Sequence, residues 1–195
     1  MTVGPAIPVL PDWIGGINKV RFKTVAILVL VSILFVACSN ENEGDKANNM
    51  DTTDIKELVH DYTVGNAKAS SASITSSELI VTDRNQRERT YDLPDDEFFV
   101  SIAPFINETH PCDIHSLTGC QGELANEDVD LLIENSSGDV ILNEKKQTEA
   151  NGFIDLWLPR DDTFNVTITQ DGKKTTSVIS TFDGDNTCIT DMQLS

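Results

Sequence analysis

Apolar residues along this chain recur with two different periods, which predicts one helix followed by many strands. Residues 51–54 offer side chains for a helix N-cap. The apolar residues that follow are spaced as on one face of a helix: Ile55, Leu58, Val59 and Tyr62. We therefore expect a helix of about three turns that ends near Gly65.

Beyond Gly65 the pattern changes to short runs that are typical of strands. Residues 76–82 and 90–93 flank the polar segment 83–86 and predict a hairpin, and residues 98–105 form a short apolar strand. Six further short strands are expected in about the last 70 residues, at 129–133, 140–143, 153–158, 164–169, 175–182 and 188–194. The expected fold class is mainly β, α+β overall, with a small N-terminal helix-plus-hairpin region followed by a C-terminal antiparallel β-sandwich-like domain.

The first 38 residues have the pattern of an export signal. A basic cluster at 19–23 precedes an apolar run at 25–37 that is too short to span a bilayer comfortably. The run ends in Phe-Val-Ala before Cys38, which resembles a bacterial lipobox, although Phe stands where Leu is usual. We expect an exported protein of the cell envelope that is anchored to a membrane through a lipid on Cys38. The alternative is ordinary cleavage near Ala37, which would leave a free periplasmic protein.

The rest of the chain divides into segments of different composition. Residues 1–18 do not fit a signal peptide, so we expect translation to begin downstream, at Val20. Residues 39–52 are mostly polar and are expected to be a flexible tether. The expected folded parts are a small N-terminal region at 53–106 and a C-terminal β domain at 107–195.

The chain is strongly acidic, with 14 Lys and Arg against 32 Asp and Glu and a formal net charge of -18. Such a surface repels phosphate backbones, which excludes nucleic acid as an expected partner. The sequence holds no P-loop, GxSxG, HExxH or CxxC motif. We therefore expect a binding protein and not an enzyme.

Beyond the lipobox, three cysteines remain: Cys112, Cys120 and Cys188. Structural cysteines of exported proteins come in pairs, so an odd number indicates either one disulfide with a free thiol or a metal site. Two of the three histidines, His110 and His115, lie in the same loop as the first two cysteines. Thiolates together with an imidazole suit copper(I) or zinc.

Spacing alone leaves two interpretations open. The first is a metal site of the three cysteines and one histidine, with His115 expected as the fourth ligand and His110 as the alternative. Copper(I) is satisfied by two or three thiolates, whereas structural zinc takes four ligands, and the absence of CxxC pairs disfavours a zinc ribbon. The second is an Ig-like surface interaction module with a Cys112–Cys120 disulfide, a spare Cys188 and no metal.

Several segments of the sequence resemble the CueP family of exported copper-binding proteins. The similarity extends over roughly residues 91–195 and includes the spacing of all three cysteines. Its strings are 92–104, 110–112, 115–118, 120–124, 151–153, 156–161, 179–182 and 187–188.

This resemblance implies an N-terminal part that forms a homodimer and a C-terminal β domain that bears the metal site. It implies that copper is bound as Cu(I) by three cysteines and a histidine, which here are Cys112, Cys120, Cys188 and His115. It also implies a role in copper resistance outside the cytoplasm, by sequestering copper and passing it to another cuproprotein. Zinc remains compatible with the same donors, and the thiols can reduce copper(II) stoichiometrically without turnover.

Overall fold

A computed structural model describes residues 45–46 and 52–195 of the chain. The predicted signal peptide and Cys38 lie outside the described residues, as does most of the predicted tether. Within the described part, no helix has both the length and the apolar character needed to cross a membrane.

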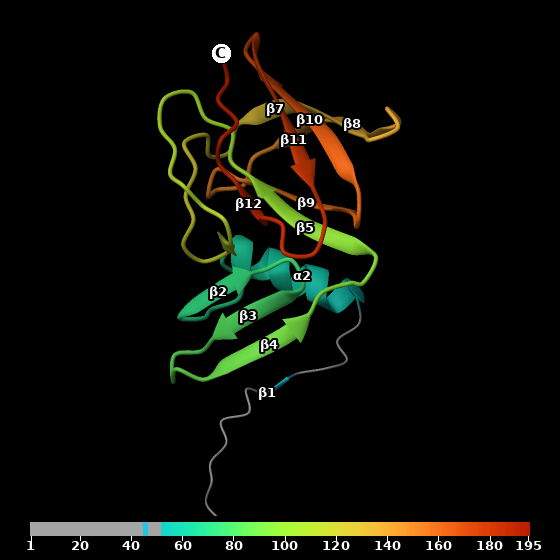
Figure 1. Ribbon diagram of the computed structural model, residues 1–195. Coiled ribbons are helices and arrows are strands. Elements are labelled where there is room, and N and C mark those ends of the chain that lie inside the picture. The colour runs from blue at the N-terminus through green and yellow to red at the C-terminus, as the bar shows by residue number, and fades with distance from the viewer. Residues whose placement is uncertain (1–44, 47–51) are drawn as a thin grey trace, which may run out of the picture. The chain divides into compact units, whose positions relative to one another are not determined.

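Among the described residues the fold is mainly β with one short helix, as the sequence predicts (Figure 1). Helix α2 (Thr52–Thr63) covers the predicted helical segment, and the chain leaves it through Gly65, whose φ of 77° suits a residue without a side chain. The hairpin is confirmed as well. The N-terminal sheet has the order β1-β4-β3-β2-β6, with β1 (Asp45–Lys46), β2 (Ser71–Ile74), β3 (Glu78–Thr82), β4 (Glu88–Asp92) and β6 (His115–Ser116).

Two further sheets face each other and form what we call the C-terminal sandwich. The four-stranded sheet, in the order β11-β10-β7-β8, is made of β7 (Asp128–Asn135), β8 (Val140–Gln147), β10 (Thr163–Gln170) and β11 (Lys173–Ser180). The three-stranded sheet, in the order β12-β5-β9, is made of β5 (Glu97–Ile102), β9 (Ile154–Pro159) and β12 (Cys188–Ile189). Alternate residues of β7 and β10 point into the core between the sheets, as their sequence pattern predicts.

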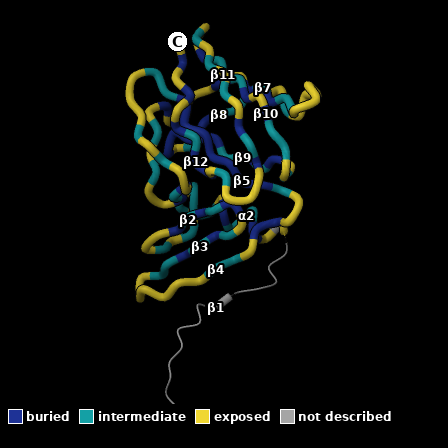
Figure 2. The backbone as a smooth tube through the Cα atoms, viewed as in Figure 1, coloured by how far each residue is buried: buried dark blue, intermediate teal, exposed yellow. Residues whose placement is uncertain are grey.

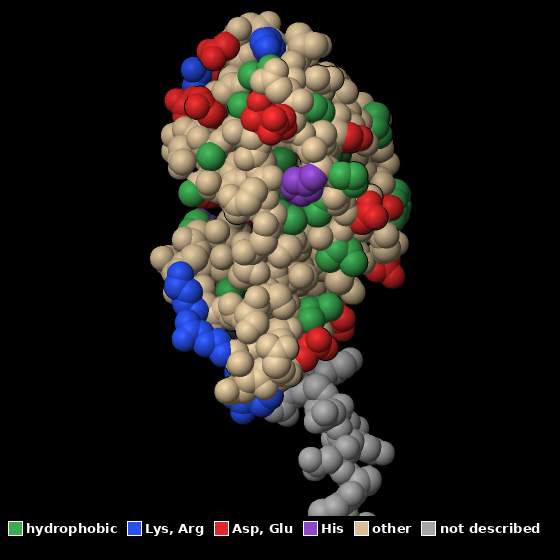
Figure 3. Space-filling model, turned by 90° about the vertical axis from the view of Figure 1, so that its left-hand side faces the viewer, with side chains coloured by type: hydrophobic (Ala, Val, Ile, Leu, Met, Phe, Trp, Pro, Cys, Tyr) green, Lys and Arg blue, Asp and Glu red, His purple; other side chains and the backbone are tan. Residues whose placement is uncertain are grey.

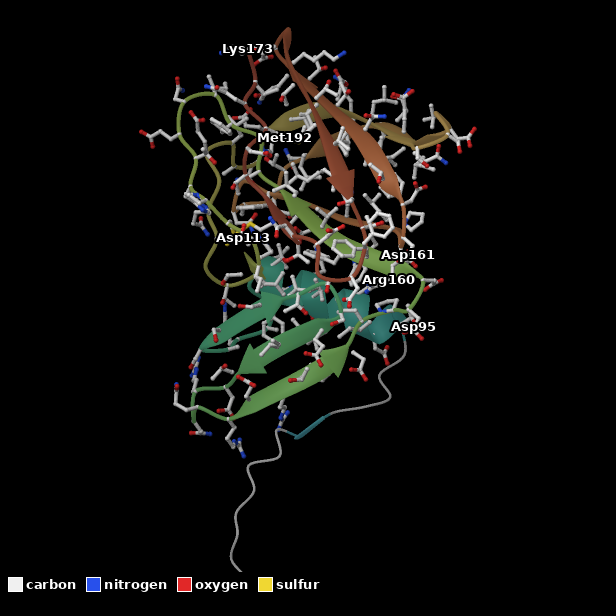
Figure 4. All side chains as sticks on the ribbon, viewed as in Figure 1. Asp95, Asp113, Arg160, Asp161, Lys173 and Met192 are labelled. Carbon is white, nitrogen blue, oxygen red and sulfur yellow. A yellow bond between two sulfur atoms is a disulfide. The ribbon has the colours of Figure 1, made fainter. Side chains whose placement is uncertain are left out.

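Helix α2 lies between the N-terminal sheet and the three-stranded sheet (Figures 1 and 2). Its buried residues Ile55 and Val59 share one apolar cluster with Leu79 of β3 and Phe99 of β5. Arg160 links the same two parts, because its guanidinium donates to the carbonyl oxygens of Pro94 and Ser76 (Figure 4). The helix-and-sheet region and the sandwich are therefore packed against each other through both apolar and polar contacts.

Two strand predictions differ from the structure. The expected strand at 188–194 is regular only in β12, because the chain beyond it makes scattered hydrogen bonds and no continuous ladder. Phe105 donates to Met192 O (3.1 Å) and accepts from Leu194 N (2.8 Å). Met192 consequently lies in the core of the sandwich. The expected strand at 98–105 ends at Ile102, ahead of a proline that has no N–H for a ladder.

Acidic side chains are spread over the face shown in Figure 3, whereas Lys and Arg side chains lie along its lower left side and, beside acidic ones, at its top. The described residues thus keep the acidic surface that the composition predicts.

Candidate metal centre

The three cysteines meet at one point of the fold, where the long loop 107–126 reaches β12. We call Cys112, Cys120 and Cys188 the cysteine cluster and residues 107–126 the cysteine loop. The three sulfur atoms all lie within 4.8 Å of one another. Residues that are 76 positions apart in the sequence therefore face each other in space.

Within the cluster, Cys112 and Cys188 are paired in a disulfide, with their Cα atoms 5.5 Å apart. Cys120 is the free cysteine of the described residues, and its sulfur lies 3.5 Å from that of Cys112. The alternative of a Cys112–Cys120 disulfide with a spare Cys188 is therefore wrong in its pairing.

Backbone hydrogen bonds bring Cys112 and Cys188 together. The carbonyl oxygen of Asp113 accepts from the N–H groups of Thr187 (3.0 Å) and Cys188 (3.2 Å). The Asp113 carboxylate also accepts a hydrogen bond from the Asn186 side chain (3.2 Å). Figure 4 labels Asp113 on the cysteine loop. Asp113 therefore attaches the cysteine loop to the start of β12.

A tight turn places Cys120 beside the disulfide. The carbonyl oxygen of Ser116 accepts from the N–H groups of Gly119 (3.2 Å) and Cys120 (3.0 Å). The Ser116 N–H in turn points at the Cys120 sulfur, 3.4 Å away. A Cβ on Gly119 would lie 2.9 Å from the Ser116 hydroxyl, so the turn leaves little room for a side chain there.

His115 completes the inner wall of the cluster. Its side chain is fully buried, its ring centroid lies 4.6 Å from that of Phe153, and its Nδ1 lies 3.5 Å from the Cys188 sulfur. Burial lowers the pKa of His115 to about 4, although the charge of Asp155 raises it. The imidazole is thus neutral at pH 7, which is the form that binds metals. Its Nε2 is buried without a hydrogen-bond partner.

His110 lies differently. Its Nε2 is 3.0 Å from the carbonyl oxygen of Gln121, and its Nδ1 is 3.3 Å from that of Pro111. A neutral imidazole has one N–H, which can donate to one of these two carbonyl oxygens. The ring of His110 is therefore hydrogen-bonded to the backbone of the cysteine loop. The third histidine, His60, is exposed on α2.

Sequence analysis missed Glu123, whose carboxylate links the end of the cysteine loop to the residues at its start. Its carboxylate accepts hydrogen bonds from the N–H groups of Ile106 (2.6 Å), Asn107 (2.8 Å) and Glu108 (3.2 Å), and from the Asn107 side chain (2.8 Å). These bonds, led by the N–H of Asn107, lower the pKa of Glu123 to about 2. One acidic residue among the three of this loop gives no sequence signal for this role.

The other end of the loop passes very close to a turn of the sandwich. Gly122 N donates to Asn151 O (2.7 Å), and a Cβ built on Gly152 would lie 2.6 Å from the Gly122 carbonyl oxygen. Gly152 also has a φ of 82°. Glycine at both positions therefore allows the backbone of the loop to touch the Asn151–Gly152 turn.

The donor set is soft: three sulfur atoms with one neutral imidazole beside them. Copper(I) prefers thiolates, and zinc accepts the same ligands in a tetrahedron. With the Cys112–Cys188 bond reduced, three thiols that are already adjacent become available to one ion. The cluster is thus a candidate site for a thiophilic metal.

Comparison with known proteins agrees with this chemistry. The family model described as "Periplasmic copper-binding protein CueP" matches residues 54–193, which include the whole cysteine cluster. The chain belongs to the CueP family. A solved crystal structure of a protein named S.CueP is similar to this chain, with a TM-score of 0.68 and 31% sequence identity. That match covers 88% of this chain and 98% of the solved one.

No curated protein matches the chain. Membership in the CueP family identifies the protein as one of the periplasmic copper-binding proteins, which confirms the resemblance found in the sequence. The family model extends further towards the N-terminus than that resemblance, because it includes helix α2 and the N-terminal sheet.

Proposed function

We propose that this chain binds copper as Cu(I) through Cys112, Cys120 and Cys188, with the buried His115 as the fourth ligand. The observation that carries the proposal is the convergence of three sulfur atoms within 4.8 Å from distant parts of the chain. The neutral ring of His115, 3.5 Å from the Cys188 sulfur, supports its role beside them. His110 is the weaker candidate because a loop carbonyl already engages its ring.

The disulfide adds a redox aspect to this function. When Cys112 and Cys188 pair, two thiols give up two electrons and two protons, and the electrons can reduce two Cu(II) ions to Cu(I). The pair is thus suited to one stoichiometric reduction and not to turnover. A new reduction by the protein requires an external thiol that first reopens the Cys112–Cys188 bond.

In the cell we propose that the protein sequesters copper in the envelope and passes it to an acceptor cuproprotein, which contributes to copper resistance. Export by residues 1–38, a lipid on Cys38 and the tether 39–52 would hold the folded part near a membrane. The N-terminal region, whose strand β4 has exposed residues, is the part proposed to form a homodimer.

The experiment that tests the metal site is a titration of Cu(I) into fully reduced protein against a chromophoric chelator. We expect about one copper ion per chain, with all three thiols protected from alkylation. Cys188→Ser should lose most of the retained copper. Met192→Leu is the matched control, because it removes a sulfur atom from the core of the sandwich and leaves the cysteine cluster intact.

A second candidate function is favoured by the disulfide itself. Cys112–Cys188 would serve an interaction module as a structural link between the cysteine loop and β12. In that case fully reduced wild type retains no copper against the chelator, and neither do the two variants. That result would overturn the copper proposal.

A further inference from the structure

The side chain and backbone of Thr187 form hydrogen bonds to several parts of the fold around the cysteine cluster. The amino-acid sequence alone does not indicate these bonds. The Thr187 side chain is only 1% exposed and lies directly before Cys188. The hydroxyl oxygen accepts a hydrogen bond from His115 N (3.0 Å) and donates one to Ile74 O (2.6 Å). We infer that Thr187 is a positioning residue of the copper site, an inference that rests on the proposed function.

The hydroxyl lies between two paired strands. Ile74 of β2 and His115 of β6 are partners in the register of the N-terminal sheet. Thr187 directly precedes β12, far from both in the sequence, yet it links the N–H of one partner to the carbonyl of the other. The backbone of His115 is thereby fixed to the residue that precedes Cys188.

The main chain of Thr187 extends the junction in two more directions. Its N–H donates to Asp113 O (3.0 Å), which belongs to the cysteine loop, and its carbonyl accepts from Ser101 N of β5 (2.8 Å). One buried residue therefore connects the N-terminal sheet, the cysteine loop and the three-stranded sheet. All four bonds are made by Thr187, the residue directly before Cys188, and one of them goes to the backbone of His115.

Removal of the hydroxyl has a definite consequence. Thr187→Val keeps the shape of the side chain but leaves a buried N–H on His115 and a buried carbonyl on Ile74 without this partner. Strand β6 has only two residues, and its other ties to β2 lie beyond it, where Leu117 N donates to Ala72 O (2.9 Å) and the Thr118 hydroxyl accepts from Ala72 N (3.1 Å). The distance between the His115 ring and the Cys188 sulfur should then vary. Loss of a group that orients a ligand lowers metal affinity by about tenfold to a hundredfold.

The chain supplies a matched control in Thr148. It is also 1% exposed, and its hydroxyl accepts from Glu127 N (2.9 Å) and donates to Leu124 O (2.5 Å). Thr148→Val therefore removes the same kind of hydroxyl bridge at the far end of the cysteine loop, where neither partner is a proposed metal ligand. Thr187→Ser, which retains the hydroxyl, tests rescue at the site itself.

The experiment compares wild type with the three variants for Cu(I) affinity by chelator competition. The ¹⁵N shifts of the His115 imidazole on Cu(I) addition are recorded alongside. We expect Thr187→Val to lose about tenfold or more in affinity and to show a weakened His115 shift. Thr148→Val should keep both at the wild-type level, and Thr187→Ser should recover most of them. Equal affinity in the two valine variants, or no recovery by Thr187→Ser, overturns the inference.

A measurement without metal separates this inference from the copper proposal. Each variant is equilibrated in a glutathione redox buffer, and its disulfides are mapped by mass spectrometry. Thr187→Val should shift pairing from Cys112–Cys188 towards Cys112–Cys120, because Cys188 is displaced while Cys120 stays 3.5 Å away. Wild type that binds no Cu(I) would overturn the copper proposal alone. Unchanged pairing in Thr187→Val would overturn the role of Thr187 alone.

Discussion

The C-terminal sandwich and the cysteine loop are held in place by different forces. The sandwich is filled by apolar side chains from β5, β7, β9 and β10, many of them fully buried. The cysteine loop contributes only a few residues to any apolar cluster and is fixed by hydrogen bonds and by one disulfide. Apolar burial is not directional, whereas hydrogen bonds depend on distance and angle.

This difference indicates which substitutions should alter the cysteine cluster without unfolding the protein. A change in the sandwich should act on global stability and leave the arrangement of the sulfur atoms intact until the protein unfolds. A change in the loop should alter the cysteine cluster while most of the apolar core persists. The following predictions test that division, in order of decreasing effect.

The largest effect is expected from a cavity in the sandwich. Phe164 of β10 is fully buried in its core. Phe164→Ala should lower the free energy of unfolding by about 3–5 kcal/mol, because it combines lost apolar burial with a cavity. Denaturant titration measures this, and the Cys112–Cys188 pairing of the folded fraction should stay unchanged. Val178→Ala, at a side chain that is 65% exposed on the same sheet, is the control and should stay within about 0.5 kcal/mol.

Reduction of the disulfide should have the next largest effect. The Cys112–Cys188 bond closes a long loop, with a sequence separation of 76, so it restricts the unfolded chain strongly. Oxidised wild type should be more stable than Cys188→Ser by about 2–4 kcal/mol in denaturant titration. Cys120→Ser keeps the bond and serves as the control. If Cys120→Ser is destabilised as much as Cys188→Ser, the pairing described above does not carry the stability.

Gly152 allows the close approach between the sandwich and the loop. Gly152→Ala should cost about 2–3 kcal/mol, since it adds a clash with Gly122 to the cost of a positive φ. Gly138, with a φ of 84° and open space around it, provides the control. Gly138→Ala should cost about 1 kcal/mol, from backbone strain alone.

Gly152→Ala should also act on the cluster, which Gly138→Ala should not. Displacement of Gly122 moves the segment that follows Cys120, so alkylation of the Cys120 thiol should become faster. Equal losses of stability in the two alanine variants, with equal alkylation rates, would mean that the loop does not depend on this contact.

Sequence analysis is more accurate for the strands of the C-terminal sandwich than for the short strands near the cysteine loop. Period-two patterns identify β7 and β10 because their buried residues, such as Val129 and Phe164, alternate with outward ones. Strand β2 (Ser71–Ile74) escapes, since a run of Ser and Ala has too little apolar contrast to stand out. Strand β6 escapes because it is two residues long and depends on β2 for its partner.

The candidate site could be anticipated only in its chemistry. The odd number of cysteines and the nearby histidines indicate a thiophilic metal, and the sulfur atoms do converge. The pairing of Cys112 with Cys188 could not be derived, because it depends on hydrogen bonds between Asp113 and residues 187–188. The role of Thr187 was equally hidden, since its partners Ile74 and His115 are far away in the sequence.

The smallest effect is expected at Glu123, and it depends on pH. The carboxylate has a pKa of about 2 in the folded protein against an ordinary value of 4.5, so the folded state favours the charged form. A lowered pKa contributes stability that is present above about pH 4.5 and is lost as the pH falls towards 2. Glu123→Gln should therefore be less stable than wild type at neutral pH, and the difference should shrink as the pH falls through that window.

Hydrogen exchange locates the effect, because the amides of Ile106 and Asn107 donate to this carboxylate. They should lose protection in Glu123→Gln while the amides of β7 and β10 keep theirs. Glu144→Gln, at an exposed residue of β8, is the control for the loss of one negative charge. A difference between Glu123→Gln and wild type that stays constant from pH 7 to about pH 2 would show that the carboxylate charge does not hold the loop. The loop would then be held by its other contacts, among them the disulfide, the Asp113 hydrogen bonds and the Gly122–Gly152 contact.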